Sequence, residues 1–323
     1  MTQEVALLRP ITRILAAIKD PMARSLPALQ KATQLARAFG AHLELFHVID
    51  SPVYVDMLGL TEDGAIRAAC DVREQCRQQL ERLAARARLH TKSVTVAVDS
   101  DYPVYEAIVR RAIAIGADLI IAERHGRRSM VPGLLRLADW ELLRLSPVPV
   151  LLVKKPHPYH RPTVLAALDP AHAFAKPPDL DEGILQIGTA VADALKGRLH
   201  AVHARHPPVL HGRRSSREKT TQDMATRFNQ ALDLHNVLQA RRHLEVGPPC
   251  DAVWRVARNT KADIVVAGAI SRSGLKRAAF GNTAELLLDC LPCDLLVVKP
   301  AGFKCAVSRE RRGGCLATVQ PLG

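Results

Sequence analysis

The feature that most constrains the fold of this 323-residue chain is an internal duplication. Residues 103–154 align without a gap on residues 248–299, with Pro103 matched to Pro248 and Ala117-Asp118 matched to Ala262-Asp263. Earlier segments pair as well, because 14–21 resembles 164–170 and 42–48 resembles 198–204. Self-similarity of this kind predicts two copies of one domain.

The two copies meet at a segment rich in proline and histidine, KPHPYHRP at 155–162. Its prolines cannot continue a strand or a helix. We therefore predict a first domain over 1–154, a linker over 155–162, a second domain over 163–303 and a flexible tail over 304–323.

Within each half, short apolar runs alternate with longer amphipathic ones, a pattern typical of βαβ units. In the first half we expect helices at 27–39, 61–89, 104–115 and 134–145. The predicted fold class is α/β, with two open five-stranded parallel sheets that carry helices on both faces. The expected strands lie near 14–18, 42–49, 93–98, 118–122 and 148–154, and near 163–168, 198–204, 242–246, 263–267 and 293–299.

Composition narrows the class of protein. No apolar run approaches the length of a spanning helix, and charged residues and proline interrupt the first twenty residues, so we expect neither a membrane span nor an export signal. Seven cysteines, an odd number, favour reduced thiols and a cytoplasmic location. Over half of the net charge of +13 lies at Arg205–Lys219 and in the tail. A solvated loop and tail are favoured over a nucleic-acid footprint because these runs lack interleaved aromatic residues and any groove-reading motif.

Candidate ligand-binding residues follow the predicted strands, where open parallel sheets bind ligands. The first strand of each half ends in Asp-Pro, at Asp20-Pro21 and Asp169-Pro170. The fourth strand of the second half leads into Gly268 to Gly274 and then into Gly281-Asn282-Thr283 at a helix start. Small residues there would expose backbone N–H groups to an anion, although an ordinary glycine turn with an N-cap fits the same residues.

These motifs resemble the universal stress protein family over nearly the whole chain except the tail, and the stretch 267–300 is especially similar to its E-type tandem branch. The resemblance implies a Rossmann-like fold of the adenine nucleotide alpha-hydrolase type, with ATP and Mg²⁺ as candidate cofactors. Nucleotide-binding members carry Gly-x-x-Gly-x9-Gly followed by Ser or Thr, and an Asp that closes strand one and meets the adenine. The residues carried over to this chain are Asp169, Gly268, Ser271, Gly281, Asn282 and Thr283.

The chain departs from the family motif in both halves. Ser271 stands at a glycine position, which weakens a tight phosphate loop, and Asn282 stands at the Ser/Thr position but can still cap a helix. In the first half the corresponding positions are Glu123, Gly126, Arg136 and Leu137. The carboxylate and the two bulky side chains among them oppose a phosphate held by bare backbone. We therefore expect a degenerate first site.

The resemblance also implies how the two halves pair. Domains of this family dimerise through their last strands, so we expect strands 148–154 and 293–299 to meet within one chain as an intrachain pseudo-dimer. Whether two such chains also form a homodimer stays open.

Two other clusters have simpler explanations. Cys290-Leu-Pro-Cys293 has the spacing of a redox or zinc motif, but it follows a predicted helix instead of opening one. His200, His203 and His206 do not share a face of a strand, which disfavours a metal cluster.

The sequence thus predicts a non-catalytic cytoplasmic stress-response protein that holds a small ligand in its second half. That ligand is ATP, another nucleotide derivative or a lipid-like molecule. Two alternatives remain. One is a slow ATPase or phosphotransferase, for which no base is apparent. The other is an interaction protein that recruits an acidic partner or nucleic acid through Arg205–Lys219.

Overall fold

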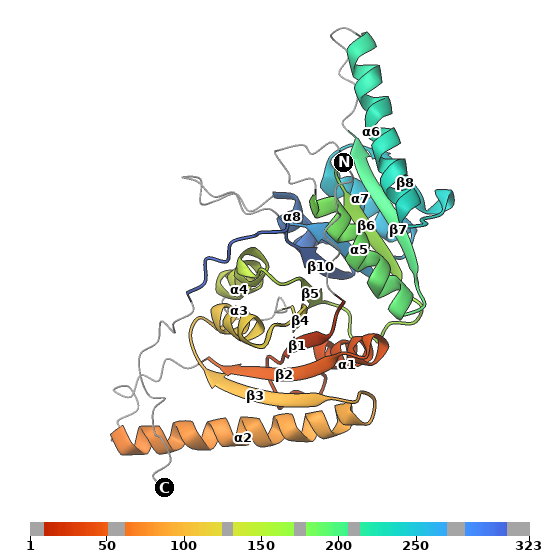
Figure 1. Cartoon of the computed structure of the whole chain (residues 1–323). Coiled ribbons are helices and arrows are strands. Elements are labelled where there is room, and N and C mark those ends of the chain that lie inside the picture. Colours follow the sequence, from red (N-terminus) through yellow and green to blue (C-terminus); the bar gives the residue numbers. More distant parts are fainter. Residues whose placement is uncertain are drawn as a thin grey trace. The chain divides into compact units, whose positions relative to one another are not determined.

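The computed structural model describes residues 10–50, 62–124, 132–170, 179–205, 214–269 and 282–308 (Figure 1). The chain divides into two compact units, one centred on Thr12–Val148 and the other on Pro149–Lys304. None of the helices in these ranges combines the length and the apolar character needed to cross a bilayer.

The first unit is a four-stranded parallel sheet in the order β3-β2-β1-β4, with Ala16 paired to Leu45 on one side and to Ile121 on the other. Its strands and helices alternate along the chain, and the bounds closely match the predicted ones. They are β1 (Arg13–Ala17), α1 (Pro27–Phe39), β2 (His42–Ile49), α2 (Glu62–Arg88), β3 (Val94–Ser100), α3 (Val104–Ile115), β4 (Leu119–Glu123) and α4 (Pro132–Leu145).

The second unit repeats the plan and adds the last strand of the first repeat. Its sheet has the order β5-β10-β9-β6-β7-β8, and every neighbouring pair in it is parallel except β5 with β10. The elements are β5 (Val150–Val153), β6 (Thr163–Leu168), α5 (Asp179–Ala194), β7 (Arg198–Arg205), α6 (Arg214–Leu234), β8 (Arg242–Val246), α7 (Pro249–Asn259), β9 (Ile264–Gly268), α8 (Asn282–Cys290) and β10 (Asp294–Val298).

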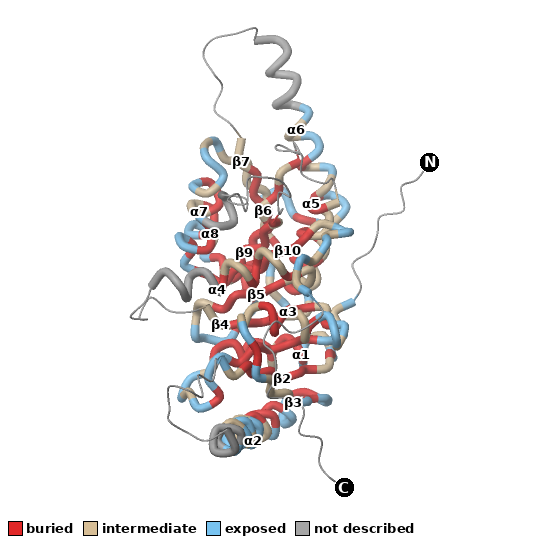
Figure 2. Tube along the Cα trace, turned by 90° about the vertical axis from the view of Figure 1, so that its left-hand side faces the viewer, coloured by how far each residue is buried: buried red, intermediate tan, exposed pale blue. Residues whose placement is uncertain are grey.

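Both the fold class and the expected strand pairing are confirmed. The strands are parallel βαβ strands, and their central positions are buried, as the red segments of β6, β9 and β10 in Figure 2 show. The last strands of the two repeats meet antiparallel, with Leu151 opposite Leu296. Apolar side chains on both faces explain the continuous Val, Ile and Leu runs of these strands.

Local sequence explains where the helices begin and end. Helix α1 has Pro27 in its first turn, where a missing N–H costs nothing, and it ends at Gly40 with φ of 67°. Leu35 and Ala36 are fully buried on its inner face. Helix α3 ends in the same way at Gly116, with φ of 63°.

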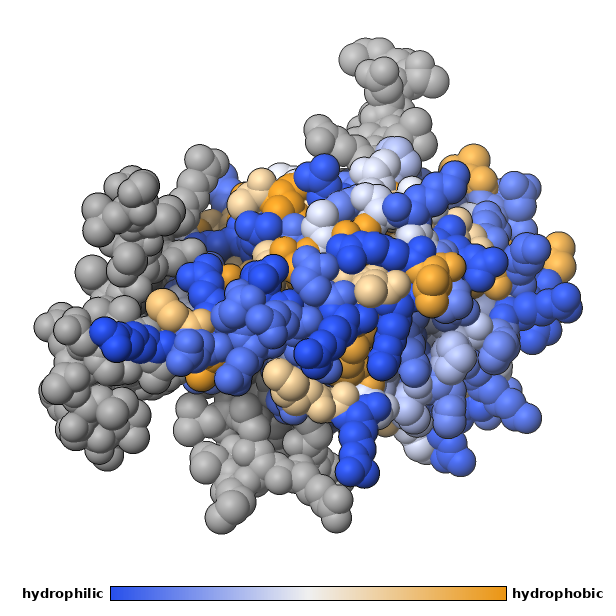
Figure 3. Space-filling model, turned by 90° about the horizontal axis from the view of Figure 1, so that it is seen from below, coloured by the Kyte–Doolittle hydropathy of each residue, from blue (hydrophilic) through white to orange (hydrophobic). Residues whose placement is uncertain are grey.

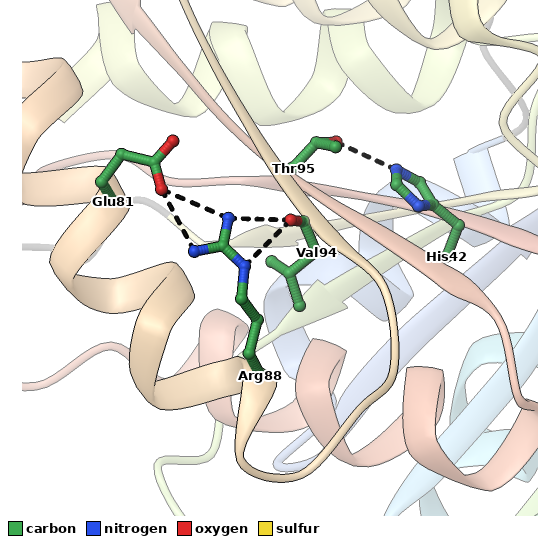
Figure 4. Close-up of polar contacts among 5 residues, drawn as sticks. All are labelled: His42, Glu81, Arg88, Val94 and Thr95. Atoms are coloured by element: carbon green, nitrogen blue, oxygen red, sulfur yellow. Dashed lines mark hydrogen bonds and ion pairs between the residues drawn. The ribbon is translucent and has the colours of Figure 1, made fainter.

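The long helix α2 lies along β3 (Figure 1). Arg88 in its last turn donates to the carbonyl oxygen of Val94 from Nε (3.2 Å) and Nη2 (2.9 Å), and it pairs with Glu81 at 3.2 Å (Figure 4). On the neighbouring strand, His42 Nε2 lies 2.9 Å from Thr95 Oγ1. The two Arg88 bonds to Val94 attach the end of α2 to β3. The face drawn in Figure 3 is largely hydrophilic, with scattered apolar side chains.

The predicted linker is held by one buried carboxylate. Asp294, fully buried at the start of β10, accepts the backbone N–H groups of Lys154 (2.8 Å) and Lys155 (3.0 Å) and the Tyr159 hydroxyl (2.5 Å). Burial and the Asp294 charge raise the pKa of Tyr159, so its hydroxyl stays protonated and able to donate. This segment is therefore a tethered part of the second unit.

Candidate functional site

Strand order places the candidate site at the carboxyl edge of β6 and β9. The chain runs from β6 outward to β7 and β8, and it then returns to β9 on the other side of β6. Ala167 pairs with Ala267, so Asp169 and Gly268 end neighbouring parallel strands. Such a point, where the strand order reverses, is where open α/β sheets bind ligands.

Asp169 is held at this edge by a second aspartate. Its backbone N–H donates to both carboxylate oxygens of Asp181, each at 3.1 Å. Asp181 is buried in the first turn of α5, where a negative charge is favoured by the helix dipole. Sequence reasoning missed Asp181, since the equivalent helix α1 has no acidic residue in its first turn.

Gly268 is in close contact with α5. A Cβ atom at this position would lie 2.6 Å from Leu180 Cδ2 and 2.8 Å from Leu180 Cγ, and Leu180 is itself 1% exposed. The absence of a side chain therefore allows helix and strand to pack closely. The structure thus gives Gly268 a packing role. Its contact with a ligand remains a prediction.

The remaining predicted site residues lie around the start of α8. Ser271 and Gly281 fall outside the described residues. Asn282 and Thr283 open α8, and their side chains are likewise outside the description. Because α8 ends at Cys290, shortly before the amino end of β10, its first turn is directed toward the carboxyl edge where Asp169 lies.

A buried histidine lies beside Asp169 and was also missed as a site feature. His203 Nδ1 lies 3.2 Å from the carbonyl oxygen of Leu168, and His47 makes the equivalent contact with Ile18 at 2.8 Å. A carbonyl can only accept, so Nδ1 carries the hydrogen in both rings. The alignment of 42–48 with 198–204 already pairs His47 with His203. This match in the sequence could have indicated that the two histidines have equivalent positions in the fold.

The environment of His203 keeps its ring neutral. Burial lowers its pKa, while the bond to Leu168 and the charges of Asp169 and Asp181 act in the opposite direction. Its Nε2 is buried and has no hydrogen-bond partner among the described residues. Since His47 forms the same Nδ1 bond in the first unit, the bond itself belongs to the shared fold.

The same edge of the first unit has different chemistry. Asp20 is exposed, and its Oδ1 accepts the backbone N–H of Met22 at 2.9 Å. Glu123 ends the neighbouring strand β4. Two acidic residues at one strand-order reversal disfavour an anion. Gly126 lies outside the described residues, and Arg136 and Leu137 fall within α4.

The other predicted clusters can now be placed. Cys290 ends α8, and Cys293 is buried just before β10, where burial raises its pKa to about 11. The described part of the chain contains no group of three or more His, Cys, Asp or Glu side chains that could hold a metal ion. His206 and most of the basic segment after Arg205 lie outside the described residues.

The model of the "Universal stress protein family" matches residues 10–154 and 175–299. Universal stress protein E of Salmonella typhi is 28% identical over 317 residues, which cover 90% of this chain and 95% of that protein. The counterpart of Escherichia coli K12 is 26% identical over 310 residues, with the same coverage.

Solved structures are similar to this chain over most of its length. A functionally unknown protein of Pseudomonas aeruginosa PAO1 superposes with a TM-score of 0.68 at 26% identity, covering 90% of this chain and 93% of that one. A universal stress protein of Archaeoglobus fulgidus gives 0.60 at 17% identity, covering 88% and 96%, and this likeness concerns the fold alone.

Proposed function

The chain belongs to the universal stress protein family, and from that premise we propose that its second repeat binds a small anionic ligand non-catalytically in the stress response. The first candidate is ATP. The observation that carries the proposal is the shared edge of Asp169, Gly268 and the first turn of α8 at the strand-order reversal of the second sheet.

Charge suggests how the ligand would be oriented. Asp169 and Asp181 make the β6 end acidic, so this end suits N–H and O–H donors of a base or a sugar. An anionic portion would bind near Ser271, Gly281, Asn282 and Thr283, where the N–H groups of a helix start favour negative charge.

The first repeat would not bind the same ligand. Asp20 and Glu123 end neighbouring strands there, so an approaching phosphate would meet two acidic residues. The proposal is therefore asymmetric between the two repeats. This asymmetry supplies a control within one chain.

The test is mass spectrometry of small molecules released by denaturing the purified, undialysed protein, followed by calorimetric titration with ATP and AMP. We expect a bound nucleotide in the wild type and its loss in Gly281→Asp, which puts a carboxylate beside the helix start. Arg136→Asp places the same charge at the equivalent position of the first repeat and should leave binding unchanged. Both variants are checked for wild-type unfolding in urea.

The outcomes separate the alternatives. A protein that is empty and gives no heat with either nucleotide would overturn ATP as the ligand, and a released lipid-like molecule would redefine the site. Equal losses from Gly281→Asp and Arg136→Asp would contradict the asymmetry. Turnover of ATP abolished by Gly281→Asp would favour a slow ATPase.

A further inference from the structure

The opposite edge of the second sheet carries a row of cations. All strands from β9 through β6 and β7 to β8 are parallel, so their amino ends share one edge. Six basic residues lie at or just before these amino ends. One of them, Arg242, pairs with Asp233, and the other five form a set we call the amino-edge row. They are Lys261 before β9, Arg161 before β6, Lys196 and Arg198 at β7, and Arg241 before β8.

The spacing of the row follows from sheet geometry. Adjacent strands lie about 4.8 Å apart, so cations on four neighbouring strands extend over roughly 15 Å. Lys261, Arg161, Lys196 and Arg198 are exposed, and Arg241 is half-buried. Among the described residues, none of the five makes an ion pair with a carboxylate.

The carboxylates near this edge are mostly engaged elsewhere. Asp263 accepts the backbone N–H of Thr163 at 2.9 Å, and Asp233 pairs with Arg242 at 2.5 Å. Asp193, one turn before Lys196, is exposed. The row therefore keeps a clear excess of positive charge.

The backbone gives independent support. Lys196 and Lys261 adopt left-handed conformations, with φ of 54° and 53°, at positions that are Gly40 and Gly116 in the first repeat. An added Cβ at either glycine meets nothing within 4 Å, so the cost of a side chain there is the backbone strain of the left-handed conformation. The second repeat thus carries strain where the first has none, and at both places the residue is a lysine.

Besides burial, the charges of the amino-edge row lower the pKa of a nearby histidine, His200. Burial, followed by the charges of His243, Arg241 and Arg198, lowers the pKa of His200 to about 4. Positive charge from two members of the row therefore acts on the same point.

Exposed leucines lie at the β8 end of the row. Leu234 ends α6 with 80% of its surface exposed, and Leu238, just before Arg241, is 58% exposed. Among the described residues of this edge, no Phe, Tyr or Trp side chain is exposed for stacking on a nucleic-acid base. A partner with carboxylates and aliphatic side chains fits such a surface better than a phosphate backbone does.

We propose that the amino-edge row, together with Leu234 and Leu238, is a docking surface for an acidic protein segment that carries aliphatic side chains. The surface lies on the edge opposite the proposed ligand site, so the two proposals stand or fall separately. Its attraction would be mainly electrostatic, which speeds association and weakens with salt.

The key variant is Lys196→Gly combined with Lys261→Gly in the full-length protein. It removes two charges and also relieves the left-handed strain, so the fold should be retained or slightly stabilised. The matched control is Arg37→Ala with Lys92→Ala, which removes two exposed cations from the first unit. The probe is a fluorescein-labelled synthetic peptide of Glu and Leu, and its binding is followed by fluorescence anisotropy.

We expect the Lys196→Gly/Lys261→Gly variant to weaken binding about fivefold at low salt and to flatten the salt dependence, because two exposed cations no longer attract the carboxylates of the peptide. The control pair should change neither quantity. Leu234→Ser with Leu238→Ser should weaken binding of this peptide but not of a Glu/Ala peptide.

Three results would overturn the proposal. The peptide could fail to bind the wild type, the two charge-removing pairs could have equal effects, or a single-stranded oligonucleotide could bind more tightly than the peptide with the same dependence on Lys196 and Lys261. The last result would make the row a nucleic-acid surface.

Discussion

Gly268 and Leu180 are in such close contact that a methyl group on Gly268 would lie 2.6 Å from Leu180 Cδ2. The contact joins β9, whose end forms one side of the proposed ligand site, to the first turn of α5. The same turn holds Asp169 through Asp181. Helix packing and the position of a predicted ligand residue are therefore coupled at this edge.

Gly268→Ala should destabilise the second unit by about 1–3 kcal/mol, because the new methyl forces Leu180 to move within a packed interface. Urea unfolding measures the cost. In a Leu180→Ala background, where space is available, the same substitution should cost much less, and a double-mutant cycle gives the difference. A cost that is identical in both backgrounds would show that the Leu180 contact is not its source.

Asp181→Ala should loosen the end of β6 without removing a predicted ligand residue. The Asp169 N–H would lose both of its acceptors, at a cost of about 1–3 kcal/mol. Amide hydrogen exchange at Asp169 should accelerate in proportion. Asp179→Ala is the control, since Asp179 accepts the Ala301 N–H instead. Unchanged protection at Asp169 in the Asp181 variant would refute the anchoring role.

The sequence was sufficient for the fold because the decisive signals are local and the alternating hydrophobic runs occur in both repeats. Hydrophobic runs, Pro27 at a helix start and Gly40 at a helix end predict α1 without knowledge of its neighbours. The family resemblance predicted that the last strands of the two repeats, β5 and β10, would pair.

The contacts of the site could not be predicted in this way. Asp181 has no acidic counterpart in the first turn of α1, so comparison of the repeats gave no hint of it. The close packing that Gly268 requires depends on Leu180, which is distant in sequence. The same limit applies to Asp294, whose bonds to the linker join residues far apart along the chain.

The cysteines of the Cys290–Cys293 motif should be poorly reactive. Burial raises the pKa of Cys293 to about 11 and also raises that of Cys290, which leaves little thiolate near neutral pH. Iodoacetamide followed by peptide mass spectrometry should label the exposed Cys70 first and Cys293 only after denaturant is added. A Cys290–Cys293 disulfide formed by mild peroxide treatment of the native protein would instead favour a redox role.

Two histidines on the neighbouring strands β7 and β8 stack on each other. His200 Nδ1 lies 3.1 Å from His243 Nε2, with ring centroids 5.4 Å apart and ring planes within 9°. One nitrogen must donate and the other accept, so the bond cannot survive protonation of both rings. Burial lowers the pKa of both residues, that of His200 to about 4.

The sign of the pH dependence follows from these shifts. In the unfolded chain both histidines take up protons near pH 6.5, whereas the folded chain resists protonation until the pH is lower. Their contribution to stability is therefore fully present above about pH 6.5 and is lost as the pH falls toward about 4. Urea midpoints measured across this window should fall less steeply in His200→Gln/His243→Gln than in the wild type. The exposed His90→Gln should keep the wild-type slope, and a double variant with an unchanged slope would show that acid acts elsewhere.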